Sequence, residues 1–308
     1  INEKNSDFYI IVGNMNSKSD TITWNGKIYT KKDSIVNILC MGIDKTAAEL
    51  TQDGEEGEVL YGNGGQADTI FLAVLDTETG DLTLLNLSRD SMTDVDVYNE
   101  DGQYVDTREM QLCLAYAYGD GGDSSCLNMV KAVSNLMYGV PIDAYAAIDL
   151  PAINILNDAI GGVEVDVLED LSSRDPSLTE GAHVLLKGNL AETYVRSRNQ
   201  TDPEANSKRM ARQRQYLTAF LRKGYAQVRN DWSVALTMYQ AVQAYSHMSL
   251  RVSQMLYLVS AAVQTDFRPQ NIITIPGEVV MNGEYAEYYV DEDFLFQTIM
   301  DTYYQEVS

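Results

Sequence analysis

The sequence predicts an α/β fold, a layered α-β-α sandwich around a central mixed sheet, with a short accessory hairpin at the N-terminus. Short apolar runs of strand length alternate with longer segments whose apolar residues recur at helical spacing. This alternation is typical of folds in which helices cover the faces of a sheet. No internal repeat, charge run or low-complexity linker divides the 308 residues. We therefore expect residues 1–34 to form the hairpin and residues 35–308 to form one compact domain.

The first expected elements are a hairpin and a buried strand. Residues 21–24 and 27–29 alternate weakly in hydropathy around an Asn-Gly dipeptide, which favours the tight turn of a two-residue hairpin. Residues 35–41 are almost continuously apolar, which indicates a strand buried on both faces. A polar, glycine-rich loop over residues 45–66 should separate this strand from the next one.

Residues 69–75 and 82–87 are predicted to form two further strands joined by a turn. Glycine occupies the last position of the four-residue loop between them, which suits a type I turn closed by a left-handed residue. Closing the hairpin across this loop places Asp68 opposite Arg89. The residues just outside both strand ends should therefore meet at one edge of the sheet.

The rest of the chain is expected to alternate helices with strands, with proline at position 151 opening one helix and glycines ending two of them. The expected helices are residues 109–118, 123–138, 151–160, 190–196, 207–228 and 291–304, with two more inside residues 231–263. The expected strands are residues 144–150, 163–167 and 272–275. On the long helix, spacings of seven, four and seven residues predict the core face: Met210, Leu217, Leu221 and Val228.

Composition and charge exclude several classes of site. The chain has 22 basic and 45 acidic side chains, a net charge of −23, and so we expect no nucleic-acid partner. Three cysteines without CxxC spacing and only two histidines do not support a disulfide framework, a thiolate zinc site or a histidine-rich metal site. The sequence has no GxSxG elbow, no GxxxxGK[ST] loop, no GxGxxG motif and no run of 18 apolar residues.

One segment of the chain is basic although the whole chain is acidic. Residues 194–214 hold six basic and two acidic side chains, a net charge of +4 that leaves −27 for the other 287 residues. Five of the six basic residues are arginines, and a guanidinium group binds phosphate or carboxylate through two parallel hydrogen bonds. On the long helix, Arg209, Arg212 and Gln213 are predicted to lie away from the core face. The segment therefore favours a phosphate-rich anion as ligand.

Three aspartates flank the ends of predicted strands. Asp44 follows the strand at 35–41, Asp68 precedes the next strand, and Asp90 follows the third. Loops beyond strand ends are where open α/β sheets build their sites. Carboxylates beside phosphate-binding arginines suit a hard divalent cation, because Mg²⁺ takes one or two carboxylates together with substrate oxygens.

Seven short motifs, in this order along the chain, resemble the LytR-CpsA-Psr family of cell-wall glycopolymer ligases. They are residues 37–44 (NILCMGID), 67–70 (ADTI), 87–90 (LSRD), 115–119 (AYAYG), 160–163 (IGGV), 194–198 (YVRSR) and 209–213 (RxxRQ). The core motifs fall within residues 36–222. Residues 223–308, which contain an Ile-Pro-Gly tripeptide, resemble family members that carry an additional C-terminal portion.

The resemblance implies an enzyme, a phosphotransferase, outside the bacterial cytoplasmic membrane. A single N-terminal membrane helix, which this chain beginning at Ile1 does not contain, would hold it on the extracellular face. The enzyme would transfer a glycopolymer from a polyprenyl-pyrophosphate carrier to a muramic acid hydroxyl of peptidoglycan, forming a phosphodiester by in-line attack at phosphorus. The carrier would need an apolar groove within the sheet and helix layers.

The resemblance also assigns roles to individual residues. Asp44 and Asp68 would hold Mg²⁺. In the mechanism that we expect on this basis, Asp90 or Asp68 would accept the proton of the attacking hydroxyl. The pyrophosphate would be bound by Arg89 together with five residues of the basic segment: Arg196, Arg198, Arg209, Arg212 and Gln213.

Four positions depart from the family pattern. Gln66 stands where arginine is usual, Thr93 and Gln111 where lysine is common, and Cys113 where asparagine is common. The departures at Gln66 and Thr93 remove up to two positive charges from the expected site, which predicts a weaker or altered activity. Three alternatives stay open: a non-catalytic binder of polyprenyl phosphates or acidic glycans, a pyrophosphatase, and a transcriptional regulator, which the acidic charge disfavours.

Overall fold

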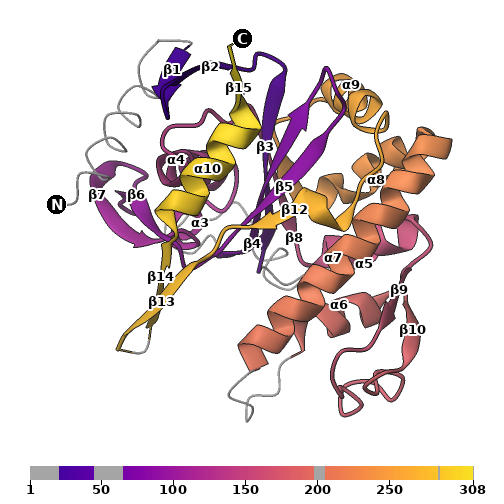
Figure 1. Ribbon diagram of the computed structural model, residues 1–308. Coiled ribbons are helices and arrows are strands. Elements are labelled where there is room, and N and C mark those ends of the chain that lie inside the picture. Colours follow the sequence, from indigo (N-terminus) through magenta and orange to yellow (C-terminus); the bar gives the residue numbers. More distant parts are fainter. Residues whose placement is uncertain (1–20, 45–64, 198–204, 284, 308) are drawn as a thin grey trace.

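The computed structural model describes residues 21–44, 65–197, 205–283 and 285–307. At its centre lies a six-stranded sheet in the order β11-β8-β3-β4-β5-β12 (Figure 1). Its strands are β3 (Ile35–Ile43), β4 (Ala67–Asp76), β5 (Leu82–Leu87), β8 (Ala144–Asp149), β11 (Ser246–Met248) and β12 (Ile272–Thr274). The pairs β3–β8 and β5–β12 are parallel and the other three pairs are antiparallel. The sheet is therefore mixed, as the sequence predicts.

The hairpin of β4 and β5 has the register expected from its loop. Ile70 pairs with Leu87 and Leu75 pairs with Leu82. Gly80 closes the turn with φ of +77°, a conformation that glycine adopts without the steric cost of a side chain. The ends of β4 and β5 that lie away from this turn consequently reach the same edge of the sheet.

Helices cover both faces of the sheet and make three layers (Figure 1). On one face, α4 (Asp123–Leu136) and α10 (Glu292–Tyr303) share a core with alternate residues of the central strands, including Leu39, Leu72 and Leu85. On the other face lie four helices: α5 (Pro151–Ala159), α7 (Ala205–Asn230), α8 (Ser233–Val242) and α9 (Val252–Ala262). The predicted layered sandwich is confirmed.

A second, smaller core extends beyond the central sheet. It joins α5 and α7 to α6 (Asn189–Arg196) and to a separate antiparallel pair, β9 (Val163–Asp166) and β10 (His183–Leu186). Tyr194 of α6 and Tyr216 of α7 lie buried in this core. The predicted strand at 163–167 therefore forms, outside the central sheet.

The N-terminal hairpin consists of β1 (Thr21–Trp24) and β2 (Lys27–Lys31), as predicted. Its two turn residues both have positive φ, which is the geometry that an Asn-Gly dipeptide favours. β15 (Tyr304–Glu306) pairs with β2, and Trp24 packs edge-on against Phe296 of α10. The hairpin is thus joined to the C-terminal end of the chain.

Two antiparallel ribbons were not anticipated. β6 (Met92–Tyr98) pairs with β7 (Tyr104–Gln111), and β13 (Gly277–Asn282) pairs with β14 (Tyr285–Val290). The predicted helix at 109–118 is wrong, because its first residues belong to β7 and only α3 (Leu114–Ala117) is helical. β7 and β13 are mostly exposed, so neither strand carries the alternating pattern that marks a half-buried strand. Two short 3₁₀ turns, η1 (Gln243–Tyr245) and η2 (Pro269–Asn271), complete the described structure.

The buried face of α7 differs from the predicted one. Of the four predicted core residues, Val228 is buried and Leu217 and Leu221 are partly buried, but Met210 is 49% exposed. Arg209, Arg212 and Tyr216 are buried instead.

A hydropathy pattern predicts that arginines face solvent, but Arg209 and Arg212 are buried. The burial of Arg212 is stabilised by partners on α6 (Tyr194), directly after it (Ser197) and before it (Glu169).

Candidate functional site

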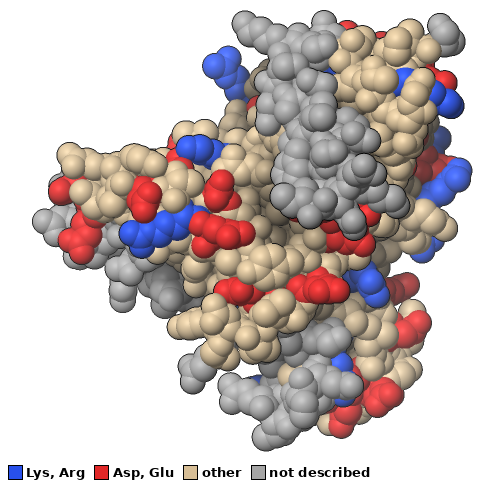
Figure 2. All heavy atoms as spheres, turned by 60° about the vertical axis from the view of Figure 1, so that its left-hand side comes forward, with Lys and Arg blue, Asp and Glu red and all other residues tan. Residues whose placement is uncertain are grey.

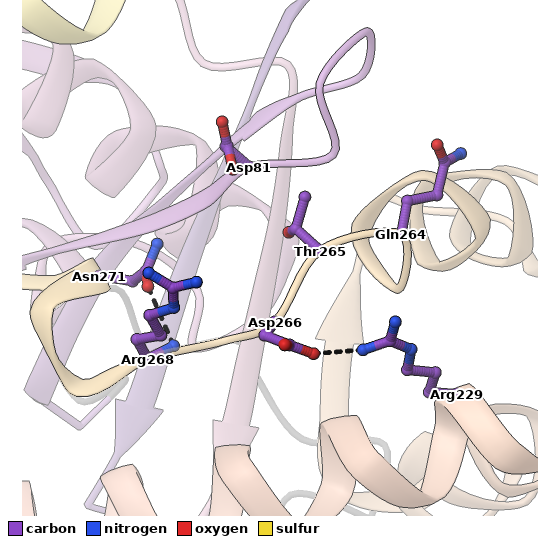
Figure 3. Close-up of a pocket in the computed structure, with 7 residues that line it drawn as sticks. All are labelled: Asp81, Arg229, Gln264, Thr265, Asp266, Arg268 and Asn271. Atoms are coloured by element: carbon purple, nitrogen blue, oxygen red, sulfur yellow. Dashed lines mark hydrogen bonds and ion pairs between the residues drawn. The ribbon is translucent and has the colours of Figure 1, made fainter.

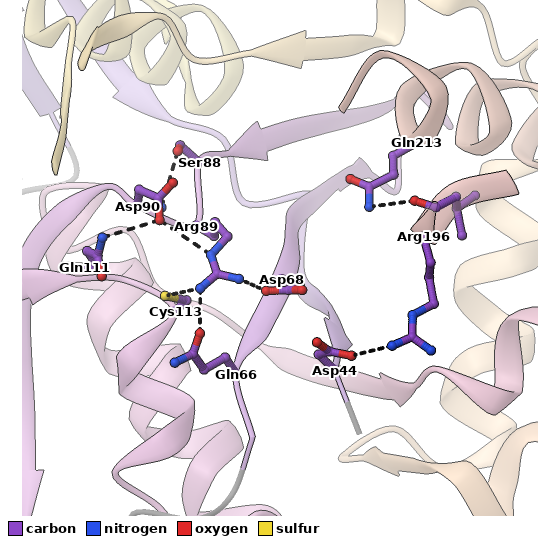
Figure 4. Close-up of polar contacts among 11 residues, drawn as sticks. Asp44, Gln66, Asp68, Ser88, Arg89, Asp90, Gln111, Cys113, Arg196 and Gln213 are labelled. Carbon is purple, nitrogen blue, oxygen red and sulfur yellow. Dashed lines mark hydrogen bonds and ion pairs between the residues drawn. The ribbon is translucent and has the colours of Figure 1, made fainter. Parts of the chain in front are cut away.

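The candidate site lies at the sheet edge where β3 ends, β4 begins and β5 ends. Asp44 directly follows β3, Asp68 is the second residue of β4, and Arg89 lies two residues after β5. Because these three neighbouring strands are antiparallel, all of these positions fall on the same edge (Figure 4). The structure thus brings together residues from segments that the sequence separates.

A β-bulge sets the position of Asp68. Gly42 pairs with Thr69 but the next residue, Ile43, pairs with Ala67, so Asp68 is the extra residue of β4. Bulges of this kind redirect a side chain at a sheet end and are common beside functional sites. A Cβ atom on Gly42 would lie 3.3 Å from Cβ of Thr69, and glycine at this position therefore allows the close approach of the two strands.

Arg89 is the centre of one half of the site. Its Nη1 forms an ion pair with Oδ1 of Asp68, as the strand register predicts, and its Nε lies 3.5 Å from Oδ1 of Asp90. Its Nη2 donates to Oε1 of Gln66 at 2.5 Å and to Sγ of Cys113 at 3.3 Å. Two of the residues that depart from the family pattern are therefore hydrogen-bond acceptors for this arginine.

The environment of Cys113 keeps its sulfur neutral. Burial raises the pKa of the Cys113 thiol, and the nearby Arg89 guanidinium only partly offsets this effect. A protonated thiol is a weak acceptor and adds no charge to the site.

The second half of the site is an ion pair between Asp44 and Arg196. Nη2 of Arg196, the last residue of α6, lies 3.4 Å from Oδ1 of Asp44. Nη1 of the same guanidinium lies 2.9 Å from Oε1 of Glu192, one helical turn earlier. Both members of the Asp44–Arg196 pair are about half exposed, so a ligand can reach them from solvent.

Arg212 has a different place from the one expected for a ligand-binding arginine. It is completely buried, its guanidinium donates to the backbone oxygens of Tyr194 and Ser197, and its Nε donates to Oε1 of Glu169 at 2.7 Å. Gln213 adds a hydrogen bond of 3.3 Å from Nε2 to the backbone oxygen of Val195. These bonds satisfy carbonyl groups at the C-terminal end of α6, which have no partners within the helix. Arg212 and Gln213 thereby fix the helix end that carries Arg196.

The remaining residues of the basic segment are placed only in part. Arg209 is buried on α7 at 8% exposure. Arg198 lies outside the described residues, so its expected role is not addressed by the structure.

The donor atoms at this edge fit Mg²⁺ only if the ligand completes the coordination. No group of three or more His, Cys, Asp or Glu side chains that could hold a metal occurs in the described part of the chain. Asp44 and Asp68 supply two carboxylates, which is the number that Mg²⁺ takes from protein when phosphate oxygens and water fill its other positions. Asp44 and Asp68 would therefore be the residues to hold Mg²⁺ together with substrate oxygens.

One face of the central sheet carries partly exposed apolar side chains. Cys40 pairs with Phe71 on one side and with Ala146 on the other, and all three are only partly buried. Paired residues project to the same face of a sheet. This is the face opposite the core under α4 and α10, and its strands run to the edge where Asp44 and Asp68 lie.

A polar pocket of about 390 Å³ lies elsewhere on the molecule (Figure 3). It is lined by residues from the β4–β5 turn, α7 and the segment before β12, and an Arg229–Asp266 ion pair borders it. Asp81 in its lining follows the turn at the end of β4 that lies away from Asp68. This pocket is therefore separate from the candidate site, and its charged groups are exposed.

Sequence reasoning missed the partners that hold the arginines. Glu192 could have been found, because a glutamate four residues before an arginine on a helix is a recognised pairing. Glu169 carries no such signal, since it lies 43 residues from Arg212. The bulge at Asp68 had a signal in Gly42, because a glycine inside a strand pattern often marks a bulge or a close backbone approach.

The fold and this edge define an α/β sandwich with aspartate–arginine pairs gathered at the ends of its central strands. Residues 7–302 match the model of the LytR_cpsA_psr family, and the chain belongs to this family.

Its relatives include TagU of Enterococcus faecalis, named polyisoprenyl-teichoic acid–peptidoglycan teichoic acid transferase, with 28% identity over 187 residues. That match covers 61% of this chain and 53% of the relative, so the chain spans about half the length of this curated protein. Among solved structures, TagV of B. subtilis has a TM-score of 0.60 at 20% identity and covers 88% of this chain and 98% of its own. A structure titled "TagT bound to LI-WTA" has a TM-score of 0.60 at 18% identity over 88% and 90% of the two chains. At these identities the structural matches establish the fold.

Proposed function

We propose that this protein transfers a cell-wall glycopolymer from a polyprenyl-pyrophosphate carrier to a muramic acid hydroxyl of peptidoglycan. The hydroxyl oxygen attacks the phosphorus that bears the glycan, the bond to the polyprenyl phosphate breaks, and a phosphodiester to peptidoglycan forms. Family membership and the names of relatives such as TagU support this reaction class.

One observation carries the proposal: two arginines from distant segments pair with aspartates on adjacent strand ends (Figure 4). Arg89 and Arg196 are 107 residues apart in the chain, yet both reach the same sheet edge. On a protein of net charge −23, such an arrangement favours an anion with several phosphate oxygens.

In the proposed mechanism, the arginines bind the pyrophosphate and neutralise charge that develops on the phosphoryl oxygens and on the leaving lipid phosphate. Asp44 and Asp68 would hold Mg²⁺, which, when bound, supplies further charge neutralisation at phosphate oxygens. Arg209 and Arg198 of the basic segment are proposed to extend this cradle. A carboxylate, Asp90 or Asp68, takes the proton of the attacking hydroxyl.

The carrier lipid is proposed to lie along the sheet face that bears Cys40, Phe71 and Ala146. Four helices lie over this face, yet these apolar side chains stay partly exposed, and a hydrocarbon chain between the sheet and the helices would cover them. The proposed place of action is the outer face of a bacterial membrane, where such carriers are anchored. Among the described helices, none combines the length and the apolar character that crossing a bilayer requires.

The test uses a synthetic polyprenyl-pyrophosphate disaccharide as donor and soluble peptidoglycan fragments as acceptor. The expected products are free polyprenyl phosphate and acceptor carrying a new phosphodiester, both measured by mass spectrometry and both lost when EDTA removes Mg²⁺. Arg89→Ala should slow turnover on the order of 10²-fold or more, because one preorganised donor is lost. Arg108→Ala is the matched control, since Arg108 is exposed on β7 and its ion pair is with Asp106 on its own strand.

Two results would contradict the transferase. Donor binding without turnover at any Mg²⁺ concentration would indicate a binder of polyprenyl phosphates or acidic glycans. Release of lipid phosphate without transfer to acceptor would indicate a pyrophosphatase.

A further inference from the structure

Asp90 lies where three separate parts of the chain meet. It occupies the turn between β5 and β6, and its backbone N–H donates to Oγ of Ser88 at 3.3 Å. The C-terminal ribbon (β13 and β14) reaches this turn, because the N–H of Tyr288 donates to the backbone oxygen of Asp90 at 2.9 Å. Ser91 and Tyr288 form a parallel β-bridge beside that bond. The backbone of Asp90 is thus fixed by a strand that lies almost 200 residues later in the chain.

Gln111 connects the same strand to the side chain of Asp90. It is the last residue of β7, and its Nε2 donates to the backbone oxygen of Ala286 in β14 at 2.6 Å. The same Nε2 lies 3.5 Å from Oδ1 of Asp90 (Figure 4). An amide nitrogen has two hydrogens, so one can serve each acceptor.

The two oxygens of the Asp90 carboxylate have different surroundings. Oδ1 faces Gln111 and Nε of Arg89, both at 3.5 Å. No hydrogen bond or ion pair reaches Oδ2 from the described residues, and the side chain is 29% exposed. A carboxylate with one oxygen oriented by the protein and the other without a partner among the described residues is able to accept a proton from an incoming hydroxyl.

Asp68 makes different contacts from Asp90. Its Oδ1 forms an ion pair with Nη1 of Arg89, and its position on the bulge places it next to the strand end that bears Asp44. These contacts suit binding of the donor and its cation.

We infer that Asp90 is the proton acceptor and that Gln111, held by Ala286 of β14, is its positioning residue. The inference rests on the proposed transfer reaction, in which the acceptor hydroxyl gives its proton to Oδ2 of Asp90 as its oxygen bonds to phosphorus. The C-terminal ribbon is therefore part of the site, because it fixes both the backbone of Asp90 and the amide that orients the carboxylate.

The first test separates the two aspartates by binding and turnover. Asp90→Ala should lower kcat by about 10²- to 10⁴-fold, the usual contribution of a general base, and leave donor binding unchanged. Added formate should restore part of the lost kcat by replacing the missing carboxylate. Asp68→Ala should weaken donor binding itself and should not respond to formate. Near-normal turnover of Asp90→Ala would overturn the assignment.

The second test concerns Gln111. Gln111→Leu should lower kcat on the order of 10-fold or more with KM unchanged, because even a small misplacement of a catalytic group is costly. Gln103→Leu is the matched control, because Gln103 is an exposed glutamine directly before the first residue of β7, at the opposite end of the strand from Gln111. This variant should leave both kcat and KM unchanged. Equal kcat for the two variants would overturn the role of Gln111.

A crystal structure of Gln111→Leu gives a readout that does not depend on turnover. The Asp90 carboxylate should change its rotamer while the Arg89–Asp68 pair stays in place. An unmoved carboxylate would overturn the positioning role. A wild-type protein that binds donor without turnover would instead contradict the proposed function, and the crystal structure would still decide whether Gln111 orients Asp90.

Discussion

Arg196 and Arg212 carry the same functional group on neighbouring helices but have opposite surroundings. Arg196 is exposed at the end of α6 and reaches Asp44, whereas Arg212 is buried and donates to Glu169 and to the backbone of α6. The Arg212 guanidinium also lies over the ring of Tyr194, 5.6 Å from its centroid. The structure therefore gives Arg212 a supporting role, in which it fixes the helix end that presents Arg196.

This role predicts a large loss of stability for Arg212→Ala. Removing one partner of a buried ion pair leaves Glu169 and two backbone oxygens without their donor, which costs about 3–5 kcal/mol in the free energy of unfolding. Urea denaturation followed by circular dichroism measures the change. Arg214→Ala, an exposed arginine two residues later, should stay within about 0.5 kcal/mol of wild type.

Equal stability of the Arg212 and Arg214 variants, combined with loss of donor binding in the Arg212 variant alone, would contradict the supporting role. It would instead favour the direct contact with pyrophosphate that the sequence suggested.

At the scale of elements, the turn between β4 and β5 joins two strands and also contacts the helix layer. The β4–β5 turn packs on the C-terminal end of α9, where Oγ1 of Thr265 donates to the backbone oxygen of Gly80 at 2.8 Å. A Cβ atom at Gly80 would lie only 2.6 Å from the backbone oxygen of Ala261. Gly26 in the N-terminal hairpin has nearly the same φ, +75° against +77°, but a Cβ atom added there would meet nothing within 4 Å.

The two glycines therefore make a matched pair. Gly26→Ala should cost about 1 kcal/mol, the strain of a left-handed alanine. Gly80→Ala should cost about 2–4 kcal/mol, because overpacking against α9 adds to the same strain. Thermal unfolding of both variants measures the difference. Equal costs would show that the turn does not pack against α9 in solution.

At the scale of the whole molecule, the acidic charge opposes the approach of an anionic donor. The chain has a net charge of −23, and on the described atoms of the face in Figure 2 acidic side chains are interspersed with fewer basic ones. Attraction to Arg89 and Arg196 acts only at short range, because Asp68 and Asp44 lie beside them. Repulsion by the whole chain acts over longer distances and is screened by salt within about 10 Å at 0.1 M.

The association rate of a pyrophosphate-bearing donor should therefore rise as ionic strength increases. Stopped-flow measurements between about 20 and 200 mM NaCl, at fixed Mg²⁺, test the sign of the dependence. An uncharged polyprenyl alcohol is the control and should show little change. A rate that falls with salt would mean that the local arginines, and not the net charge, govern the approach.

Much of the architecture was predictable because its signals are local. Apolar runs mark β3, β4 and β5, the loop glycine sets the register of β4 and β5, and that register places Asp68 beside Arg89. Proline and glycine mark the ends of α4 and α5. The exposed strands β7 and β13 were missed for the complementary reason, since strands with little buried surface leave no periodic pattern. Their partner β6 is mostly buried, and the alternation at Val95 and Val97 was not recognised as a strand.

The sequence by itself therefore determined the layered fold, the family and the set of charged residues at one sheet edge. Only the tertiary structure decided which of these residues are exposed at that edge and which are buried behind it. Whether an arginine is exposed like Arg196 or buried like Arg212 depends on groups far away in the chain, and so does the contact between β14 and Asp90. The hydropathy of a segment indicates how much of it is buried on average. An ion pair or hydrogen bond, in contrast, depends on which atoms from distant parts of the chain come within about 3 Å of each other when the protein folds.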